Sequence, residues 1–111
     1  MANKDFAAEI GRRISDRRKQ LGLTQEQAAE KADLTQQFFA SVESGSKNIR
    51  AESIIKVCYA LDLSTDFLLK GVTTDLDRSR IVKLLERLDP PQQMEMEQII
   101  LQILKFSGYS D

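Results

Sequence analysis

The chain has 111 residues, of which 41% are hydrophobic and 30% charged, and its 16 basic and 17 acidic side chains leave a net charge of −1. This composition fits a soluble globular protein with one domain, or one domain and a small appendage. The single cysteine, Cys58, excludes an internal disulfide, and the absence of histidine excludes the usual Ser-His and Cys-His catalytic pairs and the common zinc sites. We therefore expect no enzyme activity, no metal and no cofactor. We expect a cytoplasmic protein, because the first twenty residues carry charge throughout and no apolar run approaches the ~20 residues of a membrane span.

The first predicted helix covers about residues 5–21 and carries one apolar stripe, formed by Phe6, Ile10, Ile14 and Leu21. Basic side chains gather in its second half: Arg12, Arg13, Arg17, Arg18 and Lys19. DNA phosphates respond to a local field of this kind, so the net charge of −1 does not exclude a nucleic-acid partner.

Two short amphipathic helices follow, over about residues 25–32 and 36–44, with a tight turn between them. Thr24 and Gln27 have the spacing of a capping box at the start of the first, and Thr35 precedes the second as its N-cap. Two short helices joined by a tight turn predict a helix-turn-helix unit.

The helix at 36–44 presents two kinds of surface. Phe39 and Val42 form its inward pair, whereas Gln36, Gln37 and Ser41 fall elsewhere on its circumference. A glutamine amide holds a donor and an acceptor side by side, which matches the N6 and N7 atoms of adenine in the major groove. Gln36 and Gln37 are therefore the main candidates for reading bases, and Ser41 is the next.

Two further helices complete the first part of the chain, over about residues 51–61 and in a brief segment capped by Ser64, and Gly71 closes it. We predict an all-α fold, with a five-helix domain at residues 1–71 and a two-helix hairpin at 72–111.

The predicted hairpin pairs a helix at about 75–88 with one that runs to about 107. We place the start of the second at Pro91 and not at Pro90, because a residue before proline avoids the helical region. The hairpin has apolar stripes formed by Ile81, Leu84, Leu85, Leu88, Met94, Ile99, Ile100, Ile103, Leu104 and Phe106. A hairpin of this size cannot bury both stripes alone. Either a second copy of the chain covers them in a homodimer, or the hairpin folds back onto its own domain.

From about residue 10 to residue 71, the chain resembles the DNA-binding domain of the lambdoid phage repressors and Cro proteins, and of the related xenobiotic-response-element type bacterial regulators. The matching residues are Gly22, Leu23, Thr24, Gln25, Glu26, Ala29, Leu34, Thr35, Glu43 and Gly45. The sequence departs from the family at Ala28, where leucine is usual, at Asp33, where the turn usually has glycine, and at Arg50, where a serine or threonine usually caps the fourth helix. Asp33 should keep the turn, because aspartate tolerates the left-handed region better than most residues. The resemblance implies binding to double-stranded DNA through the helix at 35–44.

Several residues around this helix are candidates for phosphate contacts. Gln25 lies at the front of the helix that should cross the DNA backbone, and Lys47 and Asn48 lie in the loop after the recognition helix. Arg13 and Arg17 fit the electrostatic footprint less specifically, because a solvated helix face explains them as well. The role of a further side chain stays open: Phe38 either meets a thymine methyl or fills the space left by Ala28.

Two charges lean toward the predicted core. Arg18 lies along the apolar stripe of the first helix, and Glu43 follows Phe39 by four residues. Because an unpaired charge is costly there, we expect these two side chains to form a structural ion pair.

The sequence therefore predicts a DNA-binding transcriptional regulator that acts as a homodimer on a palindromic operator, with repression favoured over activation. Two alternatives share the fold: an antitoxin bound to a partner toxin, and a protein-interaction module that no longer binds DNA.

Overall fold

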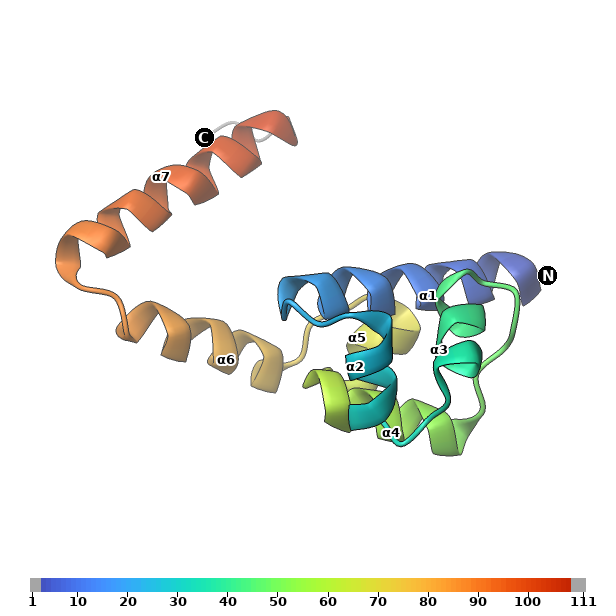
Figure 1. The fold of residues 1–111 in the computed structure, drawn as a ribbon. Coiled ribbons are helices and arrows are strands. Elements are labelled where there is room, and N and C mark those ends of the chain that lie inside the picture. Colours follow the sequence, from blue (N-terminus) through green and yellow to red (C-terminus); the bar gives the residue numbers. More distant parts are fainter. Residues whose placement is uncertain (1–2, 109–111) are drawn as a thin grey trace. The chain divides into compact units, whose positions relative to one another are not determined.

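The computed structural model describes residues 3–108, and all regular structure within this range is helical (Figure 1). The helices in chain order are α1 (Asn3–Gln20), α2 (Gln25–Lys31), α3 (Gln36–Glu43), α4 (Ala51–Leu61), α5 (Thr65–Lys70), α6 (Asp75–Glu86) and α7 (Pro90–Phe106). In the described part of the chain, no helix is both long enough and apolar enough to cross a membrane. The all-α fold and the order of helices agree with the sequence prediction.

The chain forms two compact units, an N-terminal unit that runs to Asp77 and a C-terminal unit that starts at Arg78. The first unit extends past the predicted boundary at Gly71 because Asp77 is bound to it. The Asp77 Oδ2 atom accepts hydrogen bonds from Ser64 Oγ at 2.8 Å, from Thr74 N at 2.8 Å and from Thr74 Oγ1 at 2.9 Å. The first turn of α6 is therefore fixed to the start of α5.

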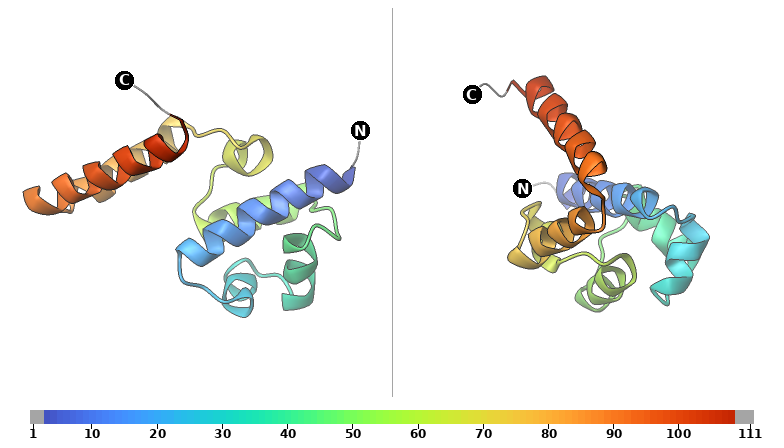
Figure 2. Two further views of the ribbon diagram at one scale, coloured as in Figure 1. Left: turned by 90° about the horizontal axis from the view of Figure 1, so that it is seen from above. Right: turned by 90° about the vertical axis from the view of Figure 1, so that its left-hand side faces the viewer.

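Helices α1 to α5 enclose the core of the N-terminal unit, with α1 lying across the shorter helices (Figures 1 and 2). The buried core consists of Ile10, Ile14, Ala28, Ala29, Ala32, Phe39, Val42, Val57, Cys58, Leu61 and Leu68. The predicted stripe of α1 is wrong at its two ends, because Phe6 is 47% exposed and Leu21 is 41% exposed. Both lie beyond the central turns of α1, where Ile10 and Ile14 meet the other helices.

A close approach between α1 and α3 sets the position of α3. A Cβ atom on Gly11 would overlap the backbone carbonyl oxygens of Val42 and Glu43, so only glycine fits at this crossing. Gly45, just after α3, has φ +80° and lies against Ala8, where an added Cβ would be 2.9 Å from the Ala8 Cα atom. The small residues Ala8 and Gly11 of α1 thus allow the C-terminal end of α3 to pack directly against the α1 backbone.

Helix α7 begins one residue before the predicted start. Asp89 is its N-cap and forms a capping box with Gln92, so Pro90 and Pro91 occupy the first two helical positions. The prediction that α7 starts at Pro91 is wrong. The N–H groups of a helix's first turn have no partner within the helix, so a proline there, which has no N–H group, loses no hydrogen bond. Asp89 itself is extended, with φ −74° and ψ 165°, as expected before proline.

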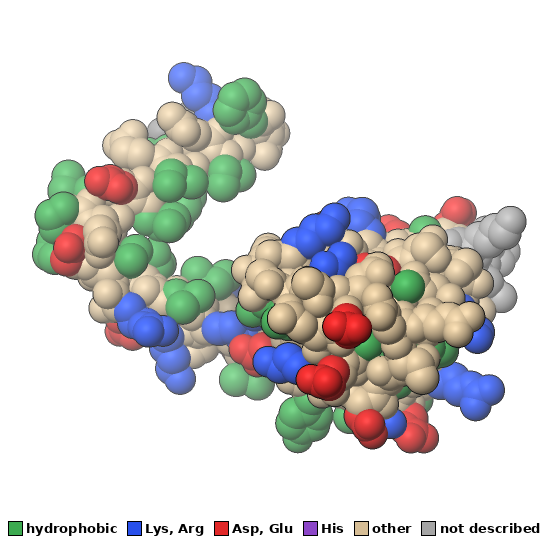
Figure 3. Space-filling model, in the orientation of Figure 1, with side chains coloured by type: hydrophobic (Ala, Val, Ile, Leu, Met, Phe, Trp, Pro, Cys, Tyr) green, Lys and Arg blue, Asp and Glu red, His purple; other side chains and the backbone are tan. Residues whose placement is uncertain are grey.

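The C-terminal unit consists of α7 and most of α6, and no residue of α7 is buried. The Gln93 Nε2 atom donates to the carbonyl oxygens of Leu85 and Leu88, at 3.0 and 3.1 Å, and so ties the two helices together. An apolar groove of about 390 Å³ lies between them, lined by Val82, Leu85, Glu86, Gln93, Met96, Glu97, Ile100 and Leu101. Hydrophobic side chains cover the facing sides of α6 and α7 in Figure 3.

Candidate nucleic-acid interface

Helix α3 is held by one face and exposed on the other. Phe39 and Val42 are buried in the core, and the small residues Ala28 and Ala29 of α2 are buried close to them. The turn between the helices is made by Asp33, whose φ of 56° lies in the left-handed region. The predicted turn therefore survives the replacement of the usual glycine.

Both helices of this unit begin at the predicted caps. Thr24 N donates to Gln27 Oε1 at 2.9 Å and Gln27 N donates to Thr24 Oγ1 at 3.1 Å, which completes the capping box of α2. Thr35 Oγ1 accepts from Phe38 N at 3.1 Å at the start of α3. These caps fix where each helix starts, and hence where Gln25 and the first turn of α3 lie.

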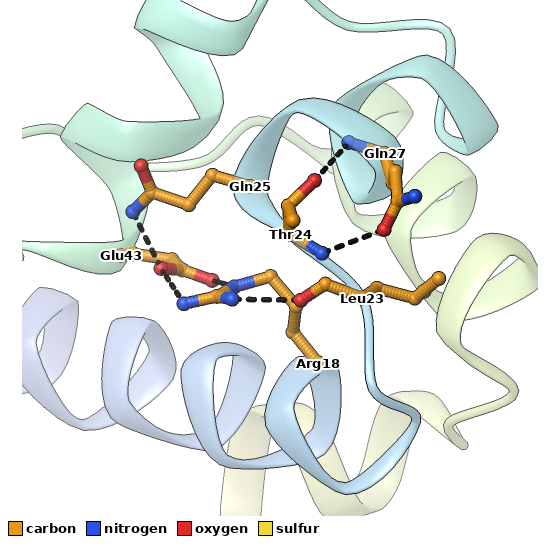
Figure 4. Close-up of polar contacts among 6 residues, drawn as sticks. All are labelled: Arg18, Leu23, Thr24, Gln25, Gln27 and Glu43. Carbon is orange, nitrogen blue, oxygen red and sulfur yellow. Dashed lines mark hydrogen bonds and ion pairs between the residues drawn. The ribbon is translucent and has the colours of Figure 1, made fainter.

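Glu43 joins α3 to both α1 and α2 (Figure 4). Its carboxylate accepts from Arg18 Nε at 2.7 Å and Arg18 Nη2 at 3.2 Å, and from Gln25 Nε2 at 2.8 Å. The Arg18 Nη1 atom also donates to the Leu23 carbonyl at 2.8 Å, which holds the loop between α1 and α2. The side chains of Arg18 and Glu43 are only 12% and 6% exposed. The predicted ion pair between them therefore forms, at the edge of the core.

Gln25 therefore lies at the start of α2 with its amide held by Glu43. An amide nitrogen carries two hydrogens, so this bond leaves one N–H and the carbonyl oxygen of the side chain for other partners. Its proposed contact with a phosphate stays a prediction. The hydrogen bond to Glu43 fixes the orientation of the Gln25 side chain.

The partners of Arg13 and Arg17 are backbone carbonyls that the sequence did not predict. Arg13 Nη1 donates to the Leu68 carbonyl at 3.0 Å and Arg17 Nε donates to the Leu61 carbonyl at 2.9 Å. These carbonyls lie in the last turns of α5 and α4, where the helix dipole favours a positive charge. Both arginines thus join α1 to later helices, and their predicted phosphate contacts remain untested.

The loop after α3 carries the other candidates for phosphate contacts. Lys47 and Asn48 are exposed, and Lys47 Nζ lies 5.6 Å from the centroid of the Phe38 ring. The preceding residue, Ser46, is fixed to Ser41, because its backbone N and its Oγ both donate to the Ser41 carbonyl at 3.1 Å. A pocket of about 240 Å³ lies at this loop, lined by Phe6, Ala7, Ile10, Val42, Lys47, Asn48, Ile49 and Ile54.

Helical geometry orders these contacts around α3. Glu43 marks one flank, facing α2, and Phe38 marks the other, facing the loop. The arc between the two flanks, opposite the buried residues, contains Gln36, Gln37 and Ser41. Gln36 and Gln37 are exposed and Ser41 is half-buried, so the three predicted readers share a surface bordered by Gln25 on one side and Lys47 on the other.

Comparison with known proteins decides the family. A family model described as helix-turn-helix matches residues 14–68, which include α2, the turn and α3. This chain belongs to the helix-turn-helix family of transcriptional regulators. It has the lambda-repressor-like fold. In this family the helix-turn-helix is the element that binds DNA.

Individual relatives agree with this assignment. An uncharacterized HTH-type transcriptional regulator, YqaE of Bacillus subtilis (strain 168), is 36% identical over 58 residues, which are 52% of this chain and 50% of that protein. The chain thus matches half the length of this curated relative.

Among solved structures, the P22 c2 repressor in complex with a synthetic operator has a TM-score of 0.55 and 28% identity, and the match covers 57% of this chain and 96% of the repressor. The clp gene regulator ClgR of Corynebacterium glutamicum has a TM-score of 0.55 and 25% identity over 58% of this chain and 83% of that one. The complex of SinR and SinI, at 24% identity and a TM-score of 0.56, covers 88% of this chain and 98% of that one and shares the fold.

Proposed function

We propose that this helix-turn-helix protein is a sequence-specific repressor that binds a palindromic operator as a homodimer, with α3 in the major groove. The observation that carries the proposal is the exposed pair Gln36 and Gln37 in the first turn of a helix whose opposite face is fixed in the core. In helix-turn-helix proteins, the N-terminal residues of the recognition helix contact base edges. Support comes from the P22 c2 repressor, whose structure was solved on a synthetic operator.

The surroundings of α3 fit a division between reading and positioning. Gln36, Gln37 and Ser41 would contact bases, because they occupy the outward arc of α3. Gln25 and Lys47 lie on the two flanks and would contact phosphates, together with Asn48 in the same loop as Lys47. Phosphate contacts fix the register of the protein on DNA, and base contacts carry the sequence information.

Selection of bound duplexes from a random pool, followed by measurement of affinity at several salt concentrations, tests the proposal. We expect an operator with two half-sites whose centres are about one helical turn apart. The logarithm of the binding constant should fall linearly with the logarithm of the salt concentration, by about 0.9 per phosphate contacted. If no duplex binds at low salt, or if the slope is near zero, the protein does not act through DNA.

Point variants then separate the two classes of contact. We expect Gln36→Ala or Gln37→Ala to cost about 1–3 kcal/mol on the operator and to leave affinity for random DNA nearly unchanged. Gln25→Ala should weaken both duplexes by the same factor. Gln98→Ala is the matched control, because this exposed glutamine of α7 does not line the groove of the C-terminal unit. Gln98→Ala should leave both affinities unchanged. Equal losses on operator and random DNA for Gln36→Ala and Gln37→Ala would contradict the assignment of these two residues.

The homodimer is proposed to form through the C-terminal unit. Ile81, Leu84, Ile99, Ile100 and Ile103 are each about half exposed, although burying one such side chain stabilises by roughly 1.5–3 kcal/mol. A twofold dimer would bury both stripes and would set the spacing of the two recognition helices.

Sedimentation of the full chain and of a fragment ending at residue 80 tests the dimer. The fragment keeps the bonds of Asp77, so the N-terminal unit stays whole. We expect a dimer for the full chain and a folded monomer for the fragment, which should recognise a half-site but bind the full operator much more weakly. A full chain that is monomeric at tens of micromolar would indicate that the hairpin packs on its own domain.

A further inference from the structure

Phe38 has no role in the interface described so far, although it lies in α3 beside Gln37. The ring packs against the buried core as a partly exposed side chain, so it is not free to turn outward. Its face is occupied by Lys47, whose Nζ atom lies 5.6 Å from the ring centroid. A ring anchored on one side and covered by a cation is poorly placed to receive a thymine methyl group.

Lys47 is held by its surroundings but keeps its charge. Ser46 donates to the Ser41 carbonyl through both its backbone N and its Oγ, at 3.1 Å each. These bonds fix the backbone immediately before Lys47. In the described part of the chain, Lys47 is not among the basic residues that pair with a carboxylate. An aromatic ring attracts an ammonium group through its quadrupole and does not neutralise it. The positive charge of Lys47 therefore remains available to an anion.

We propose that Phe38 is a positioning residue that holds the Lys47 ammonium in place for a backbone phosphate of the operator. A free lysine side chain loses rotamer entropy when it is fixed by a ligand. The Phe38 ring restricts this freedom before DNA binds, so the phosphate contact forms at lower cost. On the opposite flank of α3, Glu43 orients Gln25 in the same manner through a hydrogen bond.

This inference rests on the proposed DNA-binding function and makes a distinct prediction. A residue that acts through Lys47 should affect operator and random DNA equally, because phosphates carry no sequence information. We expect Phe38→Leu, which keeps an apolar side chain and removes the ring, to weaken binding to both duplexes by about two- to five-fold, the range for an exposed cation–π contact. Lys47→Met should weaken both duplexes and reduce the magnitude of the salt slope by about 0.9.

The experiment is a double-mutant cycle on DNA affinity, with the full chain and with both duplexes. In the Lys47→Met background, Phe38→Leu should cause no further loss, because the cation that the ring holds is gone. Phe38→Tyr should retain wild-type affinity. If Phe38→Leu does not fold, incorporation of 3,4,5-trifluorophenylalanine at position 38 keeps the shape of the ring and weakens its quadrupole, and the same loss is expected.

Three results would overturn the inference. A Phe38→Leu variant with a changed base preference at one operator position would make the ring a base contact. An equal loss with and without Lys47 would make it a part of the core only. An unchanged salt slope in Lys47→Met would remove the phosphate contact itself. A wild-type chain that binds no duplex would refute the proposed function instead. This outcome is distinct from the other three because the affinity of the wild type is measured before that of any variant.

Discussion

The Arg18–Glu43 pair offers the sharpest test of how the proposed reading surface is held together. Glu43→Leu would leave the Arg18 guanidinium, 12% exposed, with only the Leu23 carbonyl as a partner. Arg18→Met would leave the Glu43 carboxylate, 6% exposed, with only the Gln25 amide. Breaking a buried pair costs on the order of 3–5 kcal/mol, and we expect about 3 kcal/mol for each variant because the pair lies at the edge of the core.

The double variant Arg18→Met/Glu43→Leu should be more stable than the sum of the single losses implies. It leaves no charge unpaired, and two apolar side chains of similar length replace the pair. The Leu23 carbonyl loses its donor and the Gln25 amide loses its acceptor, which together cost about 1–2 kcal/mol, and imperfect packing adds about 1 kcal/mol, so we expect a total loss of about 2–3 kcal/mol. Additive losses would total ~6 kcal/mol, so a loss of only about 2–3 kcal/mol in the double variant corresponds to a coupling free energy of roughly 3–4 kcal/mol.

Urea unfolding of the wild type, the two single variants and the double variant gives the coupling free energy directly. Lys56→Met is the matched control: its Nζ atom pairs with Asp33 at 3.7 Å and Glu52 at 3.8 Å, but both carboxylates are exposed. Pairs of this kind contribute about 0–1 kcal/mol, so the control should unfold nearly as the wild type does. Additive losses in the double variant would refute the reasoning, because they would show that neither charge depends on the other.

Three further predictions concern the rest of the chain. Gly11→Ala should lower the unfolding free energy by about 1–3 kcal/mol in thermal denaturation, since the added Cβ overlaps the Val42 and Glu43 carbonyls; an unchanged melting temperature would contradict the close crossing of α1 and α3. Burial raises the pKa of the Cys58 thiol, so above about pH 8.5 the unfolded chain releases the thiol proton before the folded chain does. The wild type should therefore lose stability relative to Cys58→Ala as the pH rises. Urea unfolding between about pH 7 and pH 10 measures this loss. Asp77→Ala should abolish protection of the Thr74 amide in hydrogen exchange, because Asp77 Oδ2 is its acceptor at 2.8 Å; retained protection would show that α6 is not fixed there.

The helix-turn-helix was predictable because local rules determine it. The caps at Thr24 and Thr35 satisfy backbone N–H groups three residues away, so they can be recognised without knowledge of the fold. The left-handed turn at Asp33 follows from the same local chemistry. The outward arc of α3 follows from helical periodicity once Phe39 and Val42 are known to face inward.

The contacts that were missed join residues far apart in the sequence. Arg13 bonds to a carbonyl 55 positions later and Arg17 to one 44 positions later, so their partners depend on how α4 and α5 pack on α1. The position of Lys47 over the Phe38 ring likewise depends on the path of the loop after α3. The start of α7 differs from the prediction for a different reason: Pro90 is helical although it precedes a proline, because the N–H groups of a first turn have no partner within the helix and two prolines are tolerated there.

The two flanks of α3 should respond to substitution in different ways. Glu43 connects α1, α2 and α3 through a nearly buried ion pair, so its loss should lower the stability of the fold and displace Gln25 at the same time. Phe38 and Lys47 meet at the surface, where a cation–π contact contributes little to folding. Lys47→Met should therefore change DNA affinity while the unfolding free energy stays nearly constant, whereas substitution of Phe38, which also packs against the core, should lower both. Measuring the unfolding free energy and the DNA affinity together, on variants of both flanks, distinguishes residues that stabilise the position of α3 from residues that orient side chains toward phosphates.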